Sequence, residues 1–429
     1  MIGMNILHII QNSLPKITGS TLRSKSIFKH QREFGKVFVA TPFSFSSPYR
    51  TEIYNMIPYF RMNNKISILL RFYSKWYSRL RNILFKLVSI DIGNPILELP
   101  FSYFTKRYIR RLVKRYNIDI IHQHTDNLIG KFTLEVAKRL RIPYIYEVRG
   151  FIEMSVLATQ NGRRYQDKKI LGFVFNKIRN RETKVLERAD FITTLSEPMK
   201  NALVKRGLNE DKIVVVPNCI DNDMLTTVEK DVELKDKFGL NGAFIIGHFG
   251  TLRWYEGIEI LLEALEKVLQ YNQRIKLIIV GGAENNYLTF LKKQIRRRGL
   301  ERVVQFLGFV PHSEIGKYFS ITDVIIIPRK NTPVCRMVTP LKPIDSMAFK
   351  TLVIASDLPA LRYTIEPNQT GLLFKPEDPT DLANKILECI REPKANQHII
   401  ENAYKNILKN FVWRSVVSRY YEIYRKLTN

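Results

Sequence analysis

The feature that most constrains the fold of this chain is a repeated alternation between short apolar runs, rich in β-branched residues, and longer stretches with helical periodicity. The apolar runs are bounded by polar or turn-forming residues, and amphipathic stretches such as 133–141 (TLEVAKRLR) lie between most of them. This alternation is typical of a parallel sheet with helices wound on both faces. We therefore expect an α/β protein of the doubly wound type.

The predicted strands fall into two series. The first series comprises 5–10, 36–42, 118–124, 143–150, 191–196 and 212–218. The second comprises 243–250, 276–282, 303–310, 323–329, 352–357 and 371–375. The polar, glycine-punctuated segment 231–242 between them predicts a linker. Because 429 residues exceed the usual size of one domain, we expect two Rossmann-like domains facing across a cleft, residues 1–225 and 226–400, with 401–429 as a C-terminal helix.

The charge of the chain is unevenly distributed. Residues 1–220 carry 38 Lys and Arg against 16 Asp and Glu, a net charge of +22, and residues 221–429 carry the other 30 against 24, a net of +6. A positive field of this size attracts nucleic acid, anionic membrane or a polyanionic substrate. The stretch 71–89 is basic and aromatic at helical spacing, as in a helix that lies on a membrane surface. The alternative is a helix packed on its own domain with a solvated basic face.

Other features limit where the chain works. No apolar run of 18 residues predicts a membrane span. The first residues, MIGMNILHII, lack the cationic start and cleavage site of a secretory signal, and they predict a first buried strand. Cys219, Cys335 and Cys389 are too far apart for a disulfide framework or a metal motif, which suits a reducing compartment.

The segment 336–348 (RMVTPLKPIDSMA) carries the clearest chemistry. Thr339 suits the N-cap of a helix. The two prolines of the segment, Pro340 and Pro343, suit the first turn of that helix. Free N–H groups at a helix start attract phosphate, and Lys342 adds a positive charge there. Asp345 lies one turn further along, where it could accept hydrogen bonds from ribose hydroxyls. The alternative is a capped core helix with two solvated charges.

Several segments resemble landmarks of one enzyme family, in the order in which that family has them. They are ADFITTLSEPM (189–199), KIVVVPNCID (212–221), GTLRWYEGIEILLEA (250–264) and VTPLKPIDSMAFKTLVIASDLPALRYTI with TGLLFKPED (338–378). They are similar to the retaining glycosyltransferases of GT-B family 4, over most of 1–390. Within that family the "YEG" and "TPLKP" motifs resemble a branch that assembles surface polysaccharides and glycolipids. The resemblance implies a GT-B fold whose C-terminal helix crosses back to the N-terminal domain.

The resemblance also assigns roles on the C-terminal side. It places the nucleotide-ribose contact on Asp345 and backbone contacts to the donor on Thr339, Pro340 and Leu341. The sugar-facing glutamate of the family falls on Met337. Gly250 is placed in the donor-binding loop.

The two diphosphate-binding cations of the family are missing, because their positions fall on Thr251 and Glu256. A departing diphosphate still needs positive charge. We expect Lys342 and Arg253 to act as catalytic groups and Arg329 to bind the donor; another candidate cation is Arg336.

On the N-terminal side, the resemblance implies a glycine loop at Gly19 and Ser20 that approaches the donor, and a catalytic histidine in the cleft, best matched by His124. His122 shares a face of the same strand with His124, but no third ligand is spaced nearby, so no metal site is predicted. Glu147 and Arg149 end the next strand on one face. They are either a structural ion pair or contacts to the acceptor.

Other functional classes fit the sequence less well. A nucleic-acid-binding protein would need base-stacking aromatics on a recognised module, and none is visible. An oxidoreductase would need G-x-G-x-x-G after the first strand, and residues 14–24 (LPKITGSTLRS) do not fit. A GT-B epimerase stays open because fold alone does not fix function. A phosphorylase would need a pyridoxal lysine, for which there is no motif.

The sequence therefore predicts transfer of a sugar from a nucleoside-diphosphate sugar to an acceptor hydroxyl, with retention of configuration. No cofactor or metal is expected, and nucleic acid is not an expected partner. The resemblance implies a lipid-linked sugar or growing surface glycan as acceptor. We expect a cytoplasmic enzyme held peripherally on the inner face of the cytoplasmic membrane by its anionic surface.

Overall fold

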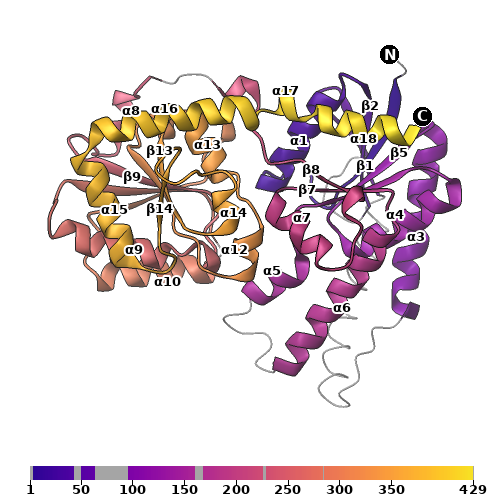
Figure 1. Ribbon diagram of the computed structural model, residues 1–429, viewed down its shortest axis with the longest axis horizontal. Helices are drawn as coiled ribbons and strands as arrows, with labels where there is room; N and C mark the ends of the chain where they lie inside the picture. Colours follow the sequence, from indigo (N-terminus) through magenta and orange to yellow (C-terminus); the bar gives the residue numbers. More distant parts are fainter. Residues whose placement is uncertain are drawn as a thin grey trace.

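The computed structural model describes residues 3–42, 50–62, 95–159, 168–225, 229–283 and 285–428. Two α/β domains lie side by side along the long axis, each with a central sheet between helices (Figure 1). The predicted pair of doubly wound domains is confirmed.

The N-terminal sheet has eight strands in the order β3-β4-β2-β1-β5-β6-β7-β8. Neighbouring strands are parallel except at one edge, where β3 and β4 pair antiparallel. The strands are β1 (Met4–Ile9), β2 (Gly35–Thr41), β3 (Thr51–Tyr54), β4 (Ile57–Arg61), β5 (Ile120–His124), β6 (Tyr144–Val148), β7 (Phe191–Thr194) and β8 (Ile213–Val215). The helices around them are α1 (Gly19–Gln31), α3 (Pro95–Tyr116), α4 (Asn127–Leu140), α5 (Ile152–Thr159), α6 (Lys168–Glu187) and α7 (Glu197–Val204), with short 3-10 turns at Glu210–Lys212 and Asn222–Met224.

The C-terminal sheet has six parallel strands in the order β11-β10-β9-β12-β13-β14. They are β9 (Phe244–Phe249), β10 (Ile275–Val280), β11 (Val304–Gly308), β12 (Val324–Ile327), β13 (Leu352–Ser356) and β14 (Leu372–Phe374). The helices are α8 (Val232–Lys237), α9 (Ile258–Leu269), α10 (Asn285–Arg297), α11 (Ile315–Ser320), α12 (Pro333–Met337), α13 (Lys342–Ala348), α14 (Pro359–Arg362) and α15 (Pro379–Arg391), with 3-10 turns at Trp254–Glu256 and His312–Glu314.

The glycine of the "YEG" motif, Gly257, is required by the local backbone geometry. Gly257, the N-cap residue of α9, has a φ of +70°, and a Cβ at this position would lie 2.0 Å from the carbonyl oxygen of Pro328. Only glycine fits such a close approach in the left-handed region. The helix that follows buries Leu261 and Leu265 completely in the core of the domain. The motif thus brings the 250–257 loop tightly against the end of β12.

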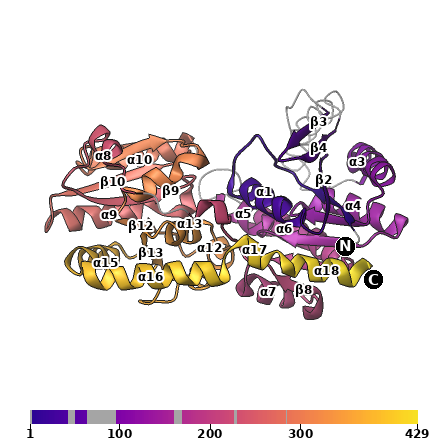
Figure 2. The same ribbon diagram turned by 90° about the horizontal axis from the view of Figure 1, so that it is seen from above.

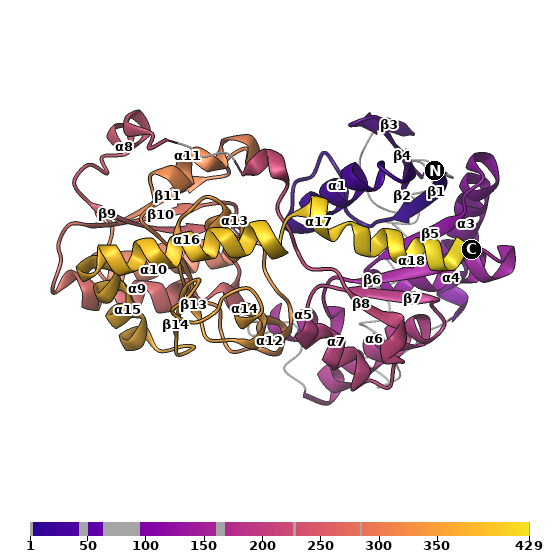
Figure 3. The ribbon, with the colours of Figure 1, turned by 45° about the horizontal axis from the view of Figure 1, so that its top comes forward.

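The C-terminal segment joins the two domains. Helix α16 (Pro393–Asn410) packs on the C-terminal domain, α17 (Trp413–Val416) lies at the boundary, and α18 (Ser418–Thr428) runs over the N-terminal domain (Figure 3). At the boundary, Ile220 N–H donates to the carbonyl of Phe411 at 2.9 Å, and Trp413 N–H donates to the carbonyl of Ile220 at 3.1 Å. The two passages of the chain between the domains are therefore hydrogen-bonded to each other.

The structure differs from the sequence-based expectations in three places. The expected linker 231–242 contains α8 and buries Leu240 completely, so it belongs to the C-terminal domain. The edge strands β3 and β4 were not predicted, and the single C-terminal helix is divided into α16, α17 and α18. The interfacial helix expected at 71–89 lies outside the described residues. Within the described ranges, no helix has the length and apolar character needed to span a membrane.

Candidate active site

Residues 338–341 lie where the two domains meet. A Cβ placed on Gly19, at the start of α1, would lie 3.5 Å from Cδ1 of Leu341, and one placed on Gly150, after β6, would lie 3.7 Å from Cγ2 of Val338. Nearby, α12 packs against α5 (Figure 2). The segment thus faces the loops that follow β1 and β6. In open parallel sheets, ligands bind beyond these carboxyl ends of the strands.

Thr339 does not cap the helix that follows it, so that expectation was wrong. Helix α13 has Leu341 at its N-cap position and no side-chain cap. The carbonyl of Thr339 accepts a hydrogen bond from the amide of Asn218 at 2.9 Å, which links the domains. Its hydroxyl is buried and has no hydrogen-bond partner among the described residues. A buried, unpaired hydroxyl of this kind can accept a ligand as its partner. The predicted donor contacts of Pro340 and Leu341 stay a prediction.

Lys342 is the centre of a buried polar cluster on the C-terminal side. Its Nζ donates to Oε2 of Glu256 at 2.6 Å and to Nε2 of His248 at 3.2 Å. His248 can accept there because its Nδ1–H donates to the carbonyl of Ile326 at 3.0 Å. Nη2 of Arg329 lies 3.7 Å from Oε1 of Glu256. Lys342 and Arg329 are thus brought together, but both are paired with a carboxylate.

The charges in this cluster are fixed by their neighbours. Burial opposes ionisation of Glu256, but Lys342 and Arg329 overcome it and bring the pKa of that carboxyl to about 2. Burial and then Lys342 lower the pKa of His248 to about 3, so this ring is neutral. Burial also lowers the pKa of Lys342, and the ion pair with Glu256 opposes this shift. The cluster therefore holds two cations and one anion in ionised form.

The loop after β9 is shaped around Lys342. Gly250 has a φ of +127°, and a Cβ on it would lie 2.7 Å from Cε of Lys342, so glycine leaves room for the lysine side chain. Arg253 is exposed and donates to the hydroxyl of Tyr255 at 2.9 Å. Arg253 is therefore close to the cluster in sequence but stands outside its buried part.

Three further residues of the segment 336–348 have distinct environments. Asp345 has no side-chain hydrogen bond or ion pair in the part of the chain that the structure describes, and burial raises its pKa to about 7. Arg336 donates to Oδ1 of Asn331 at 3.0 Å and takes no part in the Lys342 cluster. Met337 packs against the hydrophobic core of the N-terminal domain. Where the related family places a sugar-facing acid, this chain thus has an interdomain apolar contact.

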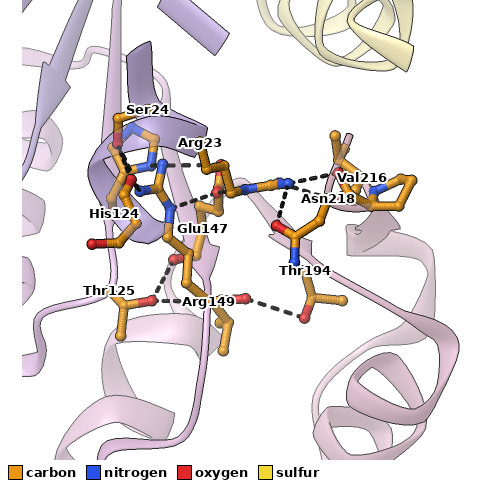
Figure 4. Close-up of polar contacts among 12 residues, drawn as sticks. Arg23, Ser24, His124, Thr125, Glu147, Arg149, Thr194, Val216 and Asn218 are labelled. Atoms are coloured by element: carbon orange, nitrogen blue, oxygen red, sulfur yellow. Dashed lines mark hydrogen bonds and ion pairs between the residues drawn. The ribbon is translucent and has the colours of Figure 1, made fainter. Parts of the chain in front are cut away.

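Arg149 organises the N-terminal side of the boundary (Figure 4). Its Nε donates to Oε1 of Glu147 at 2.7 Å, its Nη1 donates to the carbonyl of Ser20 at 2.9 Å and to Oγ of Ser24 at 2.7 Å, and its Nη2 donates to Nδ1 of His124 at 2.7 Å. One guanidinium therefore ties the first turn of α1, with Gly19 and Ser20, to the ends of β5 and β6.

Glu147 is held by two arginines rather than one. Arg23 on α1 donates to Oε1 of Glu147 at 2.9 Å, and the hydroxyl of Tyr420 on α18 donates to Oε2 at 2.6 Å. Burial alone would raise the pKa of Glu147, but Arg149 and Arg23 overcome it and hold this pKa well below its ordinary value. The Glu147–Arg149 pair is thus part of the buried framework. The sequence did not predict Arg23 and Tyr420 as partners of Glu147, because neither residue lies in a recognisable motif.

His124 does not offer a free nitrogen to the cleft. It is 3% exposed, and while Nδ1 accepts from Arg149, Nε2 lies 2.8 Å from Nδ1 of His8. His8, His122 and His124 bring one ring nitrogen each within 4.8 Å of one another, so a third histidine is nearby after all. The rings of His122 and His124 are stacked, with centroids 4.5 Å apart and an interplanar angle of 17°, and both nitrogens of His8 and of His124 take part in hydrogen bonds. The residue pattern of β1 could have pointed to His8, which pairs in register with His122.

Both halves of the chain match models of known families. Residues 231–406 match the model of "Glycosyl transferases group 1", and residues 86–224 match that of "Glycosyltransferase Family 4".

Among curated proteins, the chain is similar to the alpha-monoglucosyldiacylglycerol synthase of Streptococcus pneumoniae, with 27% identity over 74% of this chain and 72% of that protein. The synthase of the same name from Acholeplasma laidlawii is 26% identical over 70% and 73% of the two chains. The D-inositol 3-phosphate glycosyltransferase of Corynebacterium jeikeium is 22% identical over 72% of each.

Solved structures share the whole architecture. HepE of Anabaena, crystallised with UDP, covers 99% of this chain and 100% of its own with a TM-score of 0.73 and 19% identity. The sucrose-phosphate synthase of Thermosynechococcus elongatus covers 99% of both chains with a TM-score of 0.76 and 18% identity. These structures establish the GT-B fold. Together with the two family models, they support a GT-B glycosyltransferase of the group 1 and family 4 type.

Proposed function

We propose that this chain transfers a hexose from a nucleoside-diphosphate sugar to an acceptor hydroxyl, with retention of configuration and without a metal ion. The observation that carries the proposal is the interdomain placement of residues 338–341. This segment lies against the start of α1 on one side and leads directly into α13, with Lys342 and Asp345, on the other. HepE was crystallised with UDP-glucose as well as with UDP, which supports a nucleotide sugar as donor.

Lys342 and Arg329 would stabilise the diphosphate as it departs. Bond cleavage places negative charge on the leaving group, and preorganised cations stabilise that charge most strongly in a site that excludes water. Glu256 keeps the buried Lys342 in its charged form before the donor arrives. The two cations exceed the one carboxylate, so a net positive charge remains for the diphosphate. This cation pair supports the proposal that no metal ion is needed.

Asp345 and Thr339 would bind the donor without taking part in the chemistry. A carboxylate accepts well from the two hydroxyls of a ribose, and Asp345 has no competing partner among the described residues. The hydroxyl of Thr339 is buried and equally unpaired there. Ligand contacts would satisfy both groups.

The acceptor is proposed to be lipid-linked, and the enzyme is proposed to act on the inner face of the cytoplasmic membrane. Helix α3 supports this: Leu99 and Tyr103 are 60% and 59% exposed, and a groove that they line continues along Lys106, Arg107, Arg110, Arg111 and Lys114. Apolar side chains next to a row of cations are suited to an anionic lipid surface. Two relatives named as glucosyldiacylglycerol synthases are consistent with a lipid acceptor.

A thermal-shift screen with UDP, GDP, UDP-glucose, GDP-mannose and a single-stranded oligonucleotide tests the donor class. A ligand at about a hundred times its Kd adds about 2.7 kcal/mol to stability, which raises the melting temperature by several degrees. We expect one nucleotide and its sugar to do so. The nucleotide sugar that stabilises the chain is then incubated with diacylglycerol vesicles, and the product anomer is read by NMR. An epimerised donor with no glycosylated product would favour the epimerase, and stabilisation by the oligonucleotide alone would reject the proposal.

A further inference from the structure

A pocket of about 340 Å³ lies between the two domains, where α12 and α14 meet α5, α6 and α7. Figure 3 shows these five helices gathered at the domain boundary. Arg336 and Met337 line the pocket and lead directly into residues 338–341, so the pocket adjoins the proposed donor site. It lies outside the Lys342 cluster, in which Arg336 takes no part.

The lining of this pocket is strongly positive. It contains four cations and no acidic residue, and the cations come from both domains: Arg179, Lys205 and Arg206 from the N-terminal domain and Arg336 from the C-terminal domain. Arg179 and Lys205 form no ion pair within the part of the chain that the structure describes, and the partner of Arg336 is the neutral side chain of Asn331. Because like charges repel, an anion that binds among these side chains would be attracted by all of them.

Arg206 is the one cation of the pocket that is paired. Its guanidinium lies 4.2 Å from the centroid of the Phe151 ring, it forms an ion pair with Glu153, and its Nη1 lies 3.5 Å from Oε2 of Glu182. Burial, followed by the charge of Glu153, raises the pKa of Glu182 to about 8, so this carboxyl is largely protonated at neutral pH. Arg206 and Glu153 therefore balance each other, and the net charge of the pocket comes from the other three cations.

The remainder of the lining is mostly apolar. Besides the amide of Asn201, the uncharged lining residues are Met154, Phe175, Pro198, Ala202, Met337 and Pro359. A free phosphate ion would gain nothing from these side chains. A phosphate joined to an apolar chain would use both parts of the lining, because the cations give charge-assisted hydrogen bonds and the apolar groups bury hydrocarbon.

The place of the pocket suits a ligand that is anchored in a membrane. Helix α6 contributes Phe175 and Arg179 to the pocket and carries Phe173, which is 49% exposed, near its start. Helices α3 and α6 both begin at the edge of the N-terminal domain that lies at the bottom of Figure 1. The exposed Leu99 and Tyr103 lie near the start of α3. A lipid chain that leaves the pocket along α6 would therefore run toward the surface proposed to face the membrane.

We propose that this interdomain pocket binds a phosphate group that joins the lipid of the acceptor to its accepting sugar. Arg179, Lys205 and Arg336 contact the phosphate oxygens, the apolar lining takes the first part of the lipid chain, and the sugar extends toward residues 338–341. The inference rests on the proposed glycosyl transfer and narrows its lipid-linked acceptor to a lipid phosphate. Because Arg336 belongs to the other domain, the bound phosphate bridges the two domains.

Calorimetric titration with dodecyl phosphate, below its micelle concentration, tests the pocket without any turnover. Inorganic phosphate and dodecyl glucoside are the comparison ligands, since each lacks one half of this probe. We expect dodecyl phosphate to bind at least about tenfold more tightly than either of them. Equal binding of inorganic phosphate would mean a site for the free ion, and equal binding of dodecyl glucoside would mean an apolar groove. Either result would overturn the proposal.

The double variant Arg179→Gln/Lys205→Gln removes two of the unpaired cations. We expect its affinity for dodecyl phosphate to fall by about tenfold to a hundredfold, as for the loss of charge-assisted hydrogen bonds, while UDP affinity stays unchanged. Arg336→Gln should weaken binding of the same probe from the other domain. The matched control is Lys293→Gln/Arg296→Gln on α10, whose side chains are exposed and whose loss changes the net charge equally. Equal weakening in this control would show a general effect of charge and overturn the proposal.

Competition experiments separate the pocket from the donor site and from the proposed function. Saturating UDP should leave the affinity for dodecyl phosphate unchanged, and displacement by UDP would instead assign the pocket to the diphosphate of the donor. In the transfer assay, dodecyl phosphate should inhibit in competition with the lipid acceptor, and competition with the nucleotide sugar would contradict the acceptor assignment. If the wild-type chain transfers no sugar, glycosyl transfer and the acceptor role are rejected, but the titrations still decide whether the pocket binds a lipid phosphate.

Discussion

Nζ of Lys342 donates to Oε2 of Glu256 at 2.6 Å, and this ion pair joins the segment 336–348 to the loop after β9. Glu256 stands at a position where the related family carries a cation. In the proposed site the positive charge comes instead from Lys342, on a different element, and Glu256 pairs with it. Removal of Lys342 would leave the buried Glu256 with only the longer contact to Arg329, at 3.7 Å, and loss of a buried partner of this kind costs about 3–5 kcal/mol.

Lys342→Met should therefore lose both stability and activity. We expect a fall in kcat of about 10²–10³, equivalent to about 2–4 kcal/mol in the chemical step, because a cation that stabilises the leaving group is gone. The melting temperature should also fall. Steady-state kinetics and thermal unfolding of the same preparation measure the two effects.

The double variant Lys342→Met/Glu256→Gln separates these effects, because it also removes the carboxylate that has lost its closest counter-ion. Its melting temperature should recover toward that of the wild type while kcat stays low. Recovery of kcat along with stability would assign the leaving-group role to Arg329 or Arg253.

Asp345 should make both stability and donor binding depend on pH near neutrality. The pKa of Asp345 is about 7 in the folded chain, and its ordinary value is 3.8. Between these two pH values the folded state therefore binds a proton at Asp345 that the unfolded state has released. Stability contributed by this group therefore falls as pH rises from about 4 to 7. Asp345→Asn should remove this dependence and melt higher than the wild type at pH 8.

Donor binding should show the opposite trend, since ribose hydroxyls donate to the carboxylate form of Asp345. The affinity of the wild type for UDP-glucose should rise from pH 6 to pH 8, and that of Asp345→Asn should be lower and flat. Calorimetric titrations at three pH values measure this. A pH-independent wild type would remove Asp345 from the donor site.

Activity should survive EDTA. Lys342 and Arg329 supply the positive charge at the proposed leaving-group site. In the histidine cluster of the N-terminal domain, His8 and His124 use both ring nitrogens in hydrogen bonds. We expect kcat to be unchanged when EDTA is present in excess over divalent metal ions. Loss of activity in EDTA with recovery on addition of Mn²⁺ would mean that a metal ion takes the place assigned to the cation pair.

The repeating pattern of the sequence was sufficient to predict both sheets, because buried parallel strands are apolar along their whole length. Strands β12 (VIII) and β13 (LVIAS) are typical cases. Strands β3 and β4 were missed because β3 alternates between exposed and half-buried residues at a sheet edge. Its four residues carry no continuous apolar signal.

The partners of the predicted site residues were harder to foresee. The sequence indicated Lys342 but not its pairing with Glu256, because the two lie 86 positions apart. Likewise, His124 was assigned to the cleft, whereas its nitrogens are occupied by Arg149 and His8. Such contacts depend on the order of the strands in the sheet and on which helix crosses it. They therefore cannot be predicted from a local sequence pattern.

Attachment to anionic membranes is the prediction that follows from α3. The cations Arg107, Arg111 and Lys114 are exposed and recur at intervals of four and three residues, which places them on one face of the helix. Lys106, by contrast, is paired with Glu135 on α4. Each cation near an anionic surface adds about 1 kcal/mol, so reversible binding needs only a few of them.

The chain should therefore sediment with vesicles that contain phosphatidylglycerol but not with pure phosphatidylcholine vesicles, and high salt should release it because salt screens the attraction. Reversal of Arg107, Arg111 and Lys114 to Glu should abolish sedimentation while UDP affinity stays unchanged. The matched control reverses Lys293, Arg296 and Arg297 on α10, which are also exposed. It makes the same change in net charge on the other domain and should leave sedimentation intact. Equal binding to neutral vesicles, or equal loss in both triple variants, would exclude a specific role for α3 and favour a soluble glycan acceptor.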